Sequence, residues 1–205
     1  MRKSKVETAA TRQKIIEVSR TEFRRHGIDG SGLTALMAAA GMTQGGFYKH
    51  FASKAQLVAE ATKASVDDQL AKLGALGASG DPGEAFNASV ATYLSVQHRD
   101  EESGCPYAAL GSELARAQEP VKGVAVEGFE RTLALLTEQL VAARPEPGPG
   151  SAPLPSSREH AMLSLCAMMG ALTVARMAEG HALSEEVVNA VRRQLQVDVL
   201  LAPID

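Results

Sequence analysis

The chain has few aromatic residues, with no tryptophan, three tyrosines and five phenylalanines among its 205 residues. Its core must therefore be built from alanine, leucine, valine and methionine. This composition favours helices, since alanine, leucine and methionine are strong helix formers and aromatic residues are enriched in strands. The sequence also lacks a useful strand pattern and an internal repeat. We therefore predict an all-α fold of about nine helices.

Cysteines and long apolar runs are also scarce. Cys105 and Cys166 are the two cysteines, too few for a disulfide framework. The longest apolar run, 161–175, ends at Arg176 and is too short to span a bilayer. The N-terminus is charged and has no apolar stretch typical of a secretory signal. These absences predict a cytoplasmic protein without a membrane partner.

The sequence shows no cluster typical of a metal site or a cofactor site. Its five histidines are scattered, and no Cys or His pair has metal-ligand spacing. Methionines and Cys166 gather in the segment 158–179, which packing explains better than a soft metal. No glycine-rich phosphate loop follows a strand. We therefore expect no metal, no cofactor and no catalytic residues, so the protein is not expected to be an enzyme.

Acidic charge dominates overall, but the two signs are unevenly distributed. The net charge is −3, whereas residues 1–55 carry ten Lys/Arg against four Asp/Glu, a net +6, and the remainder carries −9. A basic head on an acidic body fits a module that binds a polyanion, joined to a part that does not. An ordinary solvated helix face with a basic tail is the alternative that charge alone leaves open.

The most informative segment is 32–54, which reads as two short helices joined by a tight turn. Leu33, Leu36, Met37 and Ala40 have the spacing of one apolar helix face. Gly41 can then leave the helix with a positive φ. This pattern is typical of a helix-turn-helix, whose second helix enters the major groove of DNA.

The second helix of this motif contains two glycines where stability alone would disfavour them. Thr43 is expected to cap it, with Met42 and Phe47 in the positions of a hydrophobic staple. Gly45 and Gly46 each cost about 1 kcal/mol relative to alanine, but they would let the backbone approach DNA closely. The alternative interpretation is a surface helix whose glycines permit tight packing against a neighbour.

The polar residues of this second helix suit a DNA contact. Thr43 and Gln44 stand at its start, where base edges are usually read, and Tyr48, Lys49 and His50 add a hydroxyl, a cation and an imidazole. Thr34 and Lys54 stand at the starts of the flanking helices and are expected to contact phosphates. The predicted DNA-binding residues are therefore Thr34, Thr43, Gln44, Gly45, Tyr48, Lys49, His50 and Lys54.

The segment from about Thr8 to Leu57 resembles the DNA-binding domain of TetR-type (TetR/AcrR) transcriptional regulators. The resemblance is carried by 15–23 with Gly27, by 33–41 and by 46–54, whose sequence is Gly-Phe-Tyr-Lys-His-Phe-Ala-Ser-Lys. It implies a helix-turn-helix domain over 1–52 and a helical ligand-binding and dimerisation domain over 53–205.

The remaining helices follow from capping and breaking signals. Glycines over 74–80 and prolines over 145–155 interrupt the chain, and Ser53 with Gln56 forms a capping box. Besides the two helices of the helix-turn-helix, we expect helices at about 8–26, 53–73, 106–116, 120–143, 158–179 and 184–201, and one that begins at Asp81. Ser184 is expected to cap the last helix, and residues 1–6 are expected to form a polar, basic arm.

The resemblance implies that the last two helices pair with those of a second copy, forming a homodimer that reads a palindromic operator. The alternative is that both helices only close the core of one chain. The resemblance also implies a ligand pocket between the fourth and seventh helices for a small-molecule effector. Its candidate lining residues are Phe86, Tyr93, Gln97, Cys105, Tyr107, Leu110, Phe129, Leu133, Met162 and Met169, most of which would serve equally well as ordinary core.

Cys105 stands at the start of the helix 106–116, where a helix N-terminus lowers the pKa of a thiol. This Gly-Cys turn resembles one in a branch of TetR-type regulators, some of which sense oxidants or electrophiles through cysteine. Glu101 and Glu102 would instead raise the pKa of the thiol, and a buried, inert cysteine is the alternative. Cys166 is expected in the core.

Together these features predict a ligand-controlled transcriptional regulator, a repressor that binds an operator as a dimer and is released by a small-molecule inducer. The alternatives are a redox-sensing or electrophile-sensing regulator triggered at Cys105, a small helical enzyme with a basic surface, and a protein that coats DNA without sequence preference.

Overall fold

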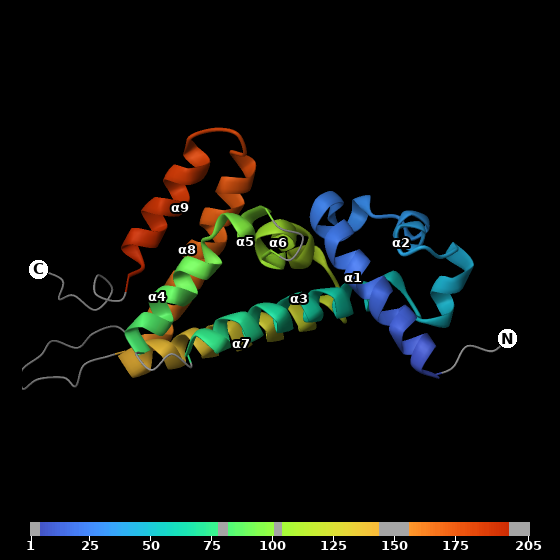
Figure 1. Ribbon diagram of the computed structural model, residues 1–205, viewed down its shortest axis with the longest axis horizontal. Helices are drawn as coiled ribbons and strands as arrows, with labels where there is room; N and C mark the ends of the chain where they lie inside the picture. The colour runs from blue at the N-terminus through green and yellow to red at the C-terminus, as the bar shows by residue number, and fades with distance from the viewer. Residues whose placement is uncertain (1–4, 78–81, 101–103, 144–155, 197–205) are drawn as a thin grey trace, which may run out of the picture.

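The computed structural model describes residues 5–77, 82–100, 104–143 and 156–196, all of which lie in helices or their connections (Figure 1). The expected linker 145–155, the cap Asp81, Glu101 and Glu102, residues 1–4 of the arm and the end of the last helix beyond 196 lie outside the described residues. The helices of the described part, in chain order, are α1 (Lys5–Gly30), α2 (Leu33–Ala39), the 3-10 helix η1 (Gln44–Lys49), α3 (Lys54–Leu76), α4 (Pro82–Tyr93), α5 (Val96–Asp100), α6 (Pro106–Arg116), α7 (Val121–Ala143), α8 (Ser157–Met177) and α9 (Leu183–Gln194).

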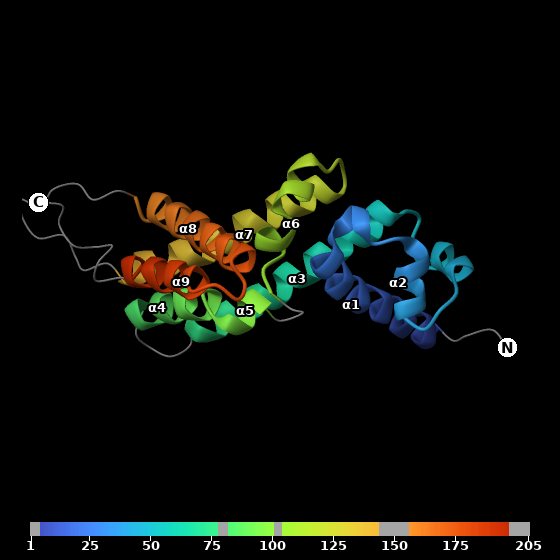
Figure 2. The same ribbon diagram turned by 90° about the horizontal axis from the view of Figure 1, so that it is seen from above.

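The helices form a head at one end of the molecule and a body at the other. The head consists of α1, α2 and η1 (residues 5–53), and the body of α3 to α9 (residues 54–196). Helix α3 starts at the head and runs lengthwise beside α7 (Figures 1 and 2). Helices α8 and α9 pack against each other at the far end of the body. The all-α architecture predicted from composition is confirmed.

The head has an apolar core that matches the spacing in the sequence. Helix α1 contributes Ile15, Ile16 and Phe23, which are buried as predicted, and these residues share one continuous core with the body. Burial of each such side chain contributes about 1.5–3 kcal/mol to stability. Gly27 has φ 76°, and it kinks α1 where the sequence predicted the helix to stop.

Two arginines of α1 fasten the head to α3. Arg12 forms an ion pair of 2.5 Å with Glu60, and Arg20 forms one of 2.6 Å with Asp68. Arg20 is buried and also donates from Nε to the Ser65 hydroxyl at 3.1 Å. Part of the positive charge of the head is therefore neutralised within the molecule rather than offered to a polyanion.

Helix α3 begins with the predicted cap. The Ser53 hydroxyl accepts a hydrogen bond of 3.1 Å from the Gln56 N–H. The Gln56 side chain accepts from the Ala52 N–H at 2.8 Å, one residue before the N–H of a standard capping box. Two backbone N–H groups at the start of α3 therefore have side-chain acceptors, although one of them differs from the expected capping box.

The helix expected from Asp81 onward divides in two at Ser95. The Ser95 hydroxyl donates to the carbonyl of Thr92 at 2.8 Å and accepts from the N–H of His98 at 3.0 Å. One side chain thus closes the end of α4 and caps the start of α5. A serine within a helical pattern can compete with the backbone in this way.

The predicted cap of the last helix is wrong. Helix α9 begins at Leu183 after Ala182, and no side chain caps it. Ser184 lies in the first turn, where its hydroxyl donates to the carbonyl of Ala175 at 2.8 Å and accepts from Arg99 at 2.7 Å. The hydroxyl joins α9 to α8 because Ser184 is buried between them.

The placement of Cys166 in the core is also wrong, since its side chain is exposed on α8. By length and hydropathy α8 could cross a membrane, although 161–175 alone appeared too short. The core helix of a soluble protein passes the same test, and one face of α8 packs on α7 and α9. The apolar character of α8 therefore has an ordinary explanation in packing.

Candidate DNA-binding surface and effector site

The turn between α2 and η1 ends α2 with a Schellman motif. Gly41 has φ 75°, and its N–H donates to the carbonyl of Ala38 at 2.9 Å. The N–H of Met42 donates to the carbonyl of Met37 at 2.8 Å. These two bonds are the pair that defines the motif, and a residue with a side chain rarely adopts the required φ. Gly41 therefore sets the direction in which the next segment leaves.

The predicted second helix is a 3-10 helix rather than an α-helix. Its i to i+3 bonds run from the Gly46 N–H to the Thr43 carbonyl at 3.0 Å and from the His50 N–H to the Phe47 carbonyl at 2.9 Å. The predicted side-chain cap by Thr43 is wrong, since no such bond forms. The two glycines lower the helix propensity of this short segment, which favours the tighter turn.

Aromatic packing holds η1 against the head. Phe47 and Phe51 are buried and stack with their ring centroids 5.6 Å apart. The Arg12 guanidinium lies 4.6 Å above the Phe51 ring, and Tyr48 meets the edge of Phe47 at 5.2 Å. The buried face of η1 is therefore fixed, and its opposite face is presented by a rigid support.

The exposed face of η1 collects the polar residues that the sequence singled out. The Tyr48 side chain is 69% exposed, and Lys49 is exposed beside it. A Cβ added at Gly45 would meet nothing within 4 Å. The Thr34 hydroxyl, also exposed, donates to the Gln44 side chain at 2.9 Å and so orients that amide. The surface formed by Thr34, Thr43, Gln44, Gly45, Tyr48 and Lys49 is called the η1 surface below.

His50 and Lys54 are less available than the other predicted DNA-binding residues. His50 is half-buried, and its carbonyl accepts from Arg12 at 3.3 Å. The Lys54 ammonium donates to the carbonyl of Ile28 at 2.5 Å, near the end of α1. A phosphate contact by Lys54 would therefore compete with a bond inside the protein.

The predicted effector residues differ in their burial, and several of them contact one another. Phe86, Tyr93, Cys105, Tyr107, Leu110 and Leu133 are buried, Phe129 and Met169 are half-buried, and Gln97 and Met162 are exposed. The Tyr107 hydroxyl donates to the carbonyl of Ala125 at 2.9 Å, and its ring meets the edge of Phe129. Most of these residues fill the core, as the alternative interpretation allowed.

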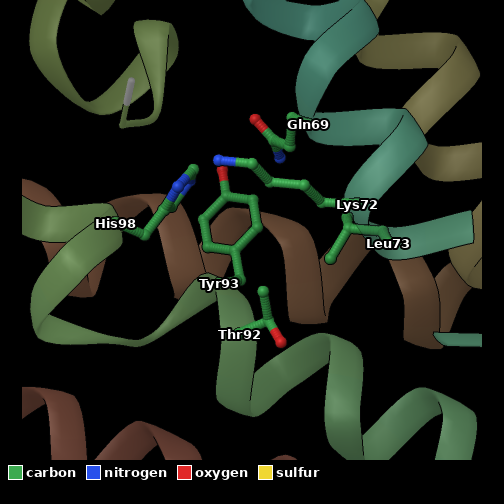
Figure 3. Close-up of a pocket in the computed structure, with 6 residues that line it drawn as sticks. All are labelled: Gln69, Lys72, Leu73, Thr92, Tyr93 and His98. Atoms are coloured by element: carbon green, nitrogen blue, oxygen red, sulfur yellow. The ribbon is translucent and has the colours of Figure 1, made fainter. Parts of the chain in front are cut away.

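A small cavity instead lies between α3, α4 and α5 (Figure 3). Its volume is about 260 Å³, part of which is open to solvent. Tyr93 is the one predicted effector residue that lines it. Its described lining residues are Gln69, Lys72, Leu73, Thr92, Tyr93 and His98.

Sequence reasoning missed Gln69, Lys72 and His98 in this role. The available signal was a polar residue within an apolar stripe, because Gln69 takes the buried position between Val66 and Leu73 on α3. His98 belongs to the helix that was expected to be continuous with α4, so its direction could not be inferred. Its ring lies 4.8 Å from that of Tyr93, measured between centroids.

Burial controls the ionisation of the groups around this cavity. It lowers the pKa of His98 to about 4, with smaller contributions from the charges of Arg24 and Lys72. Burial also raises the pKa of Tyr93 well above its ordinary value, and the neighbouring Cys105 raises it further. His98 and Tyr93 are therefore both neutral at pH 7.

Cys105 caps α6 from a buried position. Its Sγ accepts from the Ala108 N–H at 3.4 Å and lies 2.9 Å from the Tyr93 hydroxyl. The side chain is 2% exposed, and burial raises the pKa of the thiol despite these hydrogen bonds. Gly104 precedes it because a Cβ there would collide with the carbonyl of His98. The geometry is that of a structural cysteine rather than a reactive thiolate.

Within the described residues, no group of three or more His, Cys, Asp or Glu side chains is placed to hold a metal ion. The chemistry available to the head is hydrogen bonding and charge pairing on the η1 surface. In the body, the polar residues that line the cavity between α3, α4 and α5 can form hydrogen bonds with a small molecule.

Both the head and the body of the chain match models of known protein families. Residues 15–61 match the model for bacterial regulatory proteins of the tetR family. Residues 82–189 match the model for the C-terminal domain of LmrA/YxaF-like transcriptional regulators. The second match alone covers more than half of the chain.

Individual proteins agree with these matches. The probable acrEF/envCD operon repressor of Escherichia coli is 37% identical over 59 residues, which cover 29% of this chain and 27% of that protein. A TetR-family regulator from Agrobacterium tumefaciens has a TM-score of 0.77 at 19% identity, covering 92% of this chain and 99% of that one. The regulator FadR from Bacillus subtilis, solved in complex with stearoyl-CoA, has a TM-score of 0.69 at 15% identity, covering 90% and 97%.

Proposed function

Because the chain belongs to the TetR family of bacterial transcriptional regulators, we propose that it is a repressor that binds a palindromic operator as a dimer and is released by a small molecule. Regulators of this family bind DNA through a helix-turn-helix, act in the cytoplasm and are generally not enzymes. The proposal concerns the operator, the dimer and the effector of this particular chain.

The observation that carries the proposal is the η1 surface. Its polar side chains stand on a segment whose other face is fixed by Phe47 and Phe51. Gly45 leaves open space beside Tyr48 and Lys49, so a sugar-phosphate wall or base edge could approach the backbone. Contacts of these residues with base edges would give sequence preference, and charged contacts with phosphates would give affinity and salt dependence.

A second copy of the chain is proposed to cover the exposed face of α8. Leu163 and Met177 are 68% and 81% exposed, and Met162 and Cys166 are exposed on the same helix. Exposed apolar residues gathered in this way are typical of an interaction surface. Two copies joined there could present two heads to half-sites about 34–36 Å apart.

An effector is proposed to act from the body. The solved complex of FadR with stearoyl-CoA supports a small molecule as the ligand class. The cavity between α3, α4 and α5 is the proposed entry point, because α3 continues from it to the head. A ligand that widens this cavity would shift α3, and couplings of this kind are typically about 1–3 kcal/mol. A redox trigger at Cys105 is not favoured, since burial raises the pKa of that thiol.

Selection of genomic DNA fragments on the full-length protein, followed by footprinting, tests this function. We expect one or a few protected inverted repeats that the Tyr48→Ala and Lys49→Ala variants bind at least about tenfold more weakly, the loss expected from removing one good contact. The matched control is Lys122→Ala, which removes an exposed lysine from α7 in the body. Protection without an inverted repeat, or wild-type affinity in the Tyr48→Ala variant, would contradict the proposal.

A further inference from the structure

The cavity between α3, α4 and α5 contains buried polar atoms that form no hydrogen bond of standard geometry with the described residues. The Gln69 side chain is 5% exposed, and its amide lies close enough to the Tyr93 hydroxyl to lower the pKa of that group. Neither its Nε2 nor its Oε1 forms a hydrogen bond of standard geometry among the described residues. The Nε2 of His98 is buried and lacks a hydrogen-bond partner in the same sense. Buried polar side chains are nearly always hydrogen-bonded, so these atoms are available to a bound ligand.

The directions of the side chains agree with this interpretation. The Gln69 amide, the His98 ring and the Lys72 ammonium all point toward the space around the Tyr93 hydroxyl (Figure 3). Gln69 and Lys72 come from α3 and His98 comes from α5, so one ligand group could contact both helices. Lys72 is exposed and flexible enough to swing outward, which would enlarge the space.

The charge around the cavity has one sign. None of the six described lining residues is acidic, whereas Lys72 is a cation. The charges of Arg24 on α1 and Lys72 on α3 both lower the pKa of His98. The electrostatic potential at the His98 ring is therefore positive. An anion would be stabilised in this potential, and a cation would be repelled.

Three groups around the cavity can donate hydrogen bonds, while the Gln69 Oε1 is an acceptor among them. The Lys72 ammonium and the Gln69 amide nitrogen are donors, and neutral His98 can carry its proton on Nε2. The Tyr93 hydroxyl is already within 2.9 Å of the Cys105 sulfur. A group with several acceptor oxygens and a negative charge would match this set.

We propose that the effector carries a carboxylate or a similar compact oxyanion, and that this group binds between Lys72, Gln69 and His98. The inference rests on the proposed function, because it names the chemical class of the effector for the same cavity. Binding there would pull on α3 through Lys72 and Gln69 and on α5 through His98. The displacement of α3 would then rotate the DNA-binding head of each copy in the proposed dimer.

Matched pairs of small acids and amides test the proposal. The probes are benzoate, cinnamate, hexanoate and octanoate, each compared with its primary amide, which keeps the shape and removes the charge. Binding to the full-length protein is measured by ligand-observed NMR in wild type, in Lys72→Gln and in Lys122→Gln, a matched control on α7. Lys72 is exposed, so its replacement should leave the fold intact, which circular dichroism would verify.

We expect acids to bind at least about tenfold more tightly than their amides, and we expect Lys72→Gln to remove that preference, as loss of a charge-assisted hydrogen bond should. Lys122→Gln should leave it unchanged. Equal binding of acids and amides, an acid preference that survives in Lys72→Gln, or no binding of any acid at millimolar concentration would overturn the proposal.

Operator release, followed by fluorescence anisotropy, separates this inference from the proposed function. An acid that binds through Lys72 but leaves the operator bound would support the anion site and contradict effector control from this cavity. An amide that releases the operator as well as its acid does would support effector control and contradict the anion site.

Discussion

The carboxylate of Glu113 on α6 accepts a hydrogen bond of 3.0 Å from the backbone N–H of Asp29 in the head. The same carboxylate lies against Gly27, where an added Cβ would be 3.0 Å from its Oε2. The other end of α6 begins after Cys105, whose sulfur contacts the Tyr93 hydroxyl beside the cavity. One helix therefore links the kink of α1 in the head to the polar cavity in the body.

Replacing Glu113 should weaken the connection between effector and operator. We expect Glu113→Ala to remove the hydrogen bond to Asp29 and to lower the free energy of unfolding by at most about 1–2 kcal/mol, since the site is partly solvated. The head should then vary more in orientation, which distances between spin labels on the two heads of a dimer would report. Glu113→Gln keeps an acceptor oxygen and should behave like wild type. Identical distance distributions in the alanine variant and wild type would show that this contact does not orient the head.

Gly45 offers a test of why η1 contains glycines. A Cβ would meet nothing within 4 Å in the free protein, so Gly45→Ala should raise stability by about 0.5–1 kcal/mol. The same methyl group should weaken operator binding, because it would stand between the backbone and the DNA. Thermal unfolding and a DNA titration measure the two effects. Gly111→Ala, in open space on α6, should stabilise without affecting DNA binding, and equal operator affinity in both variants would favour a purely structural role for Gly45.

Much of the head could be predicted from local sequence. Apolar spacing gave the buried faces of α1 and α2, and Gly41 gave the turn, because these features depend on neighbours within a few residues. The form of η1 could not be predicted in the same way, since two glycines leave the choice between 3-10 and α-helix to packing by Phe47 and Phe51.

The cavity depended on long-range contacts and was largely missed. Lys72 and His98 are 26 residues apart, and nothing local brings them together. Lys54 shows the same difficulty, because its bond to the carbonyl of Ile28 is set by the kink at Gly27 rather than by its place in the motif. Charge counting could not reveal that Arg12 and Arg20 are paired with acidic residues of α3.

The exposed face of α8 predicts the oligomeric state. Leu163→Glu should convert a dimer into a monomer, because it would bury a carboxylate without a partner in the interface. Sedimentation velocity measures the change. Val126→Glu, which replaces a residue of α7 that is 57% exposed, is the control and should leave the dimer intact. If the Leu163→Glu protein sediments as wild type does, the second copy does not cover this face.

The two cysteines should differ in reactivity. Cys105 is buried and its pKa is raised, so it should react slowly with N-ethylmaleimide at pH 7. Cys166 is exposed in one chain, so it should react quickly in the monomeric Leu163→Glu variant and more slowly in the wild-type dimer. Mass spectrometry of timed samples, with Cys166→Ser as the control, measures both rates. Faster labelling of Cys105 than of Cys166 in the monomer would restore the redox alternative.

The stability of the protein should fall in mild acid because of His98. Its pKa is about 4 in the folded protein against an ordinary 6.5, since burial disfavours the imidazolium and Arg24 on α1 and Lys72 on α3 repel it. Its neutral form therefore contributes stability that is fully present above pH 6.5 and is lost as the pH falls toward 4, by about 2–3 kcal/mol. The free energy of unfolding of wild type and of His98→Gln can be measured in urea at several pH values. The excess stability of wild type over His98→Gln should shrink as the pH falls through this range. His26→Gln, which alters an exposed histidine, should track wild type throughout. An NMR titration that places the His98 pKa near 6.5, or a constant difference between the two unfolding curves, would contradict the assignment, because either would mean that the ring is protonated equally well in the folded and unfolded chain.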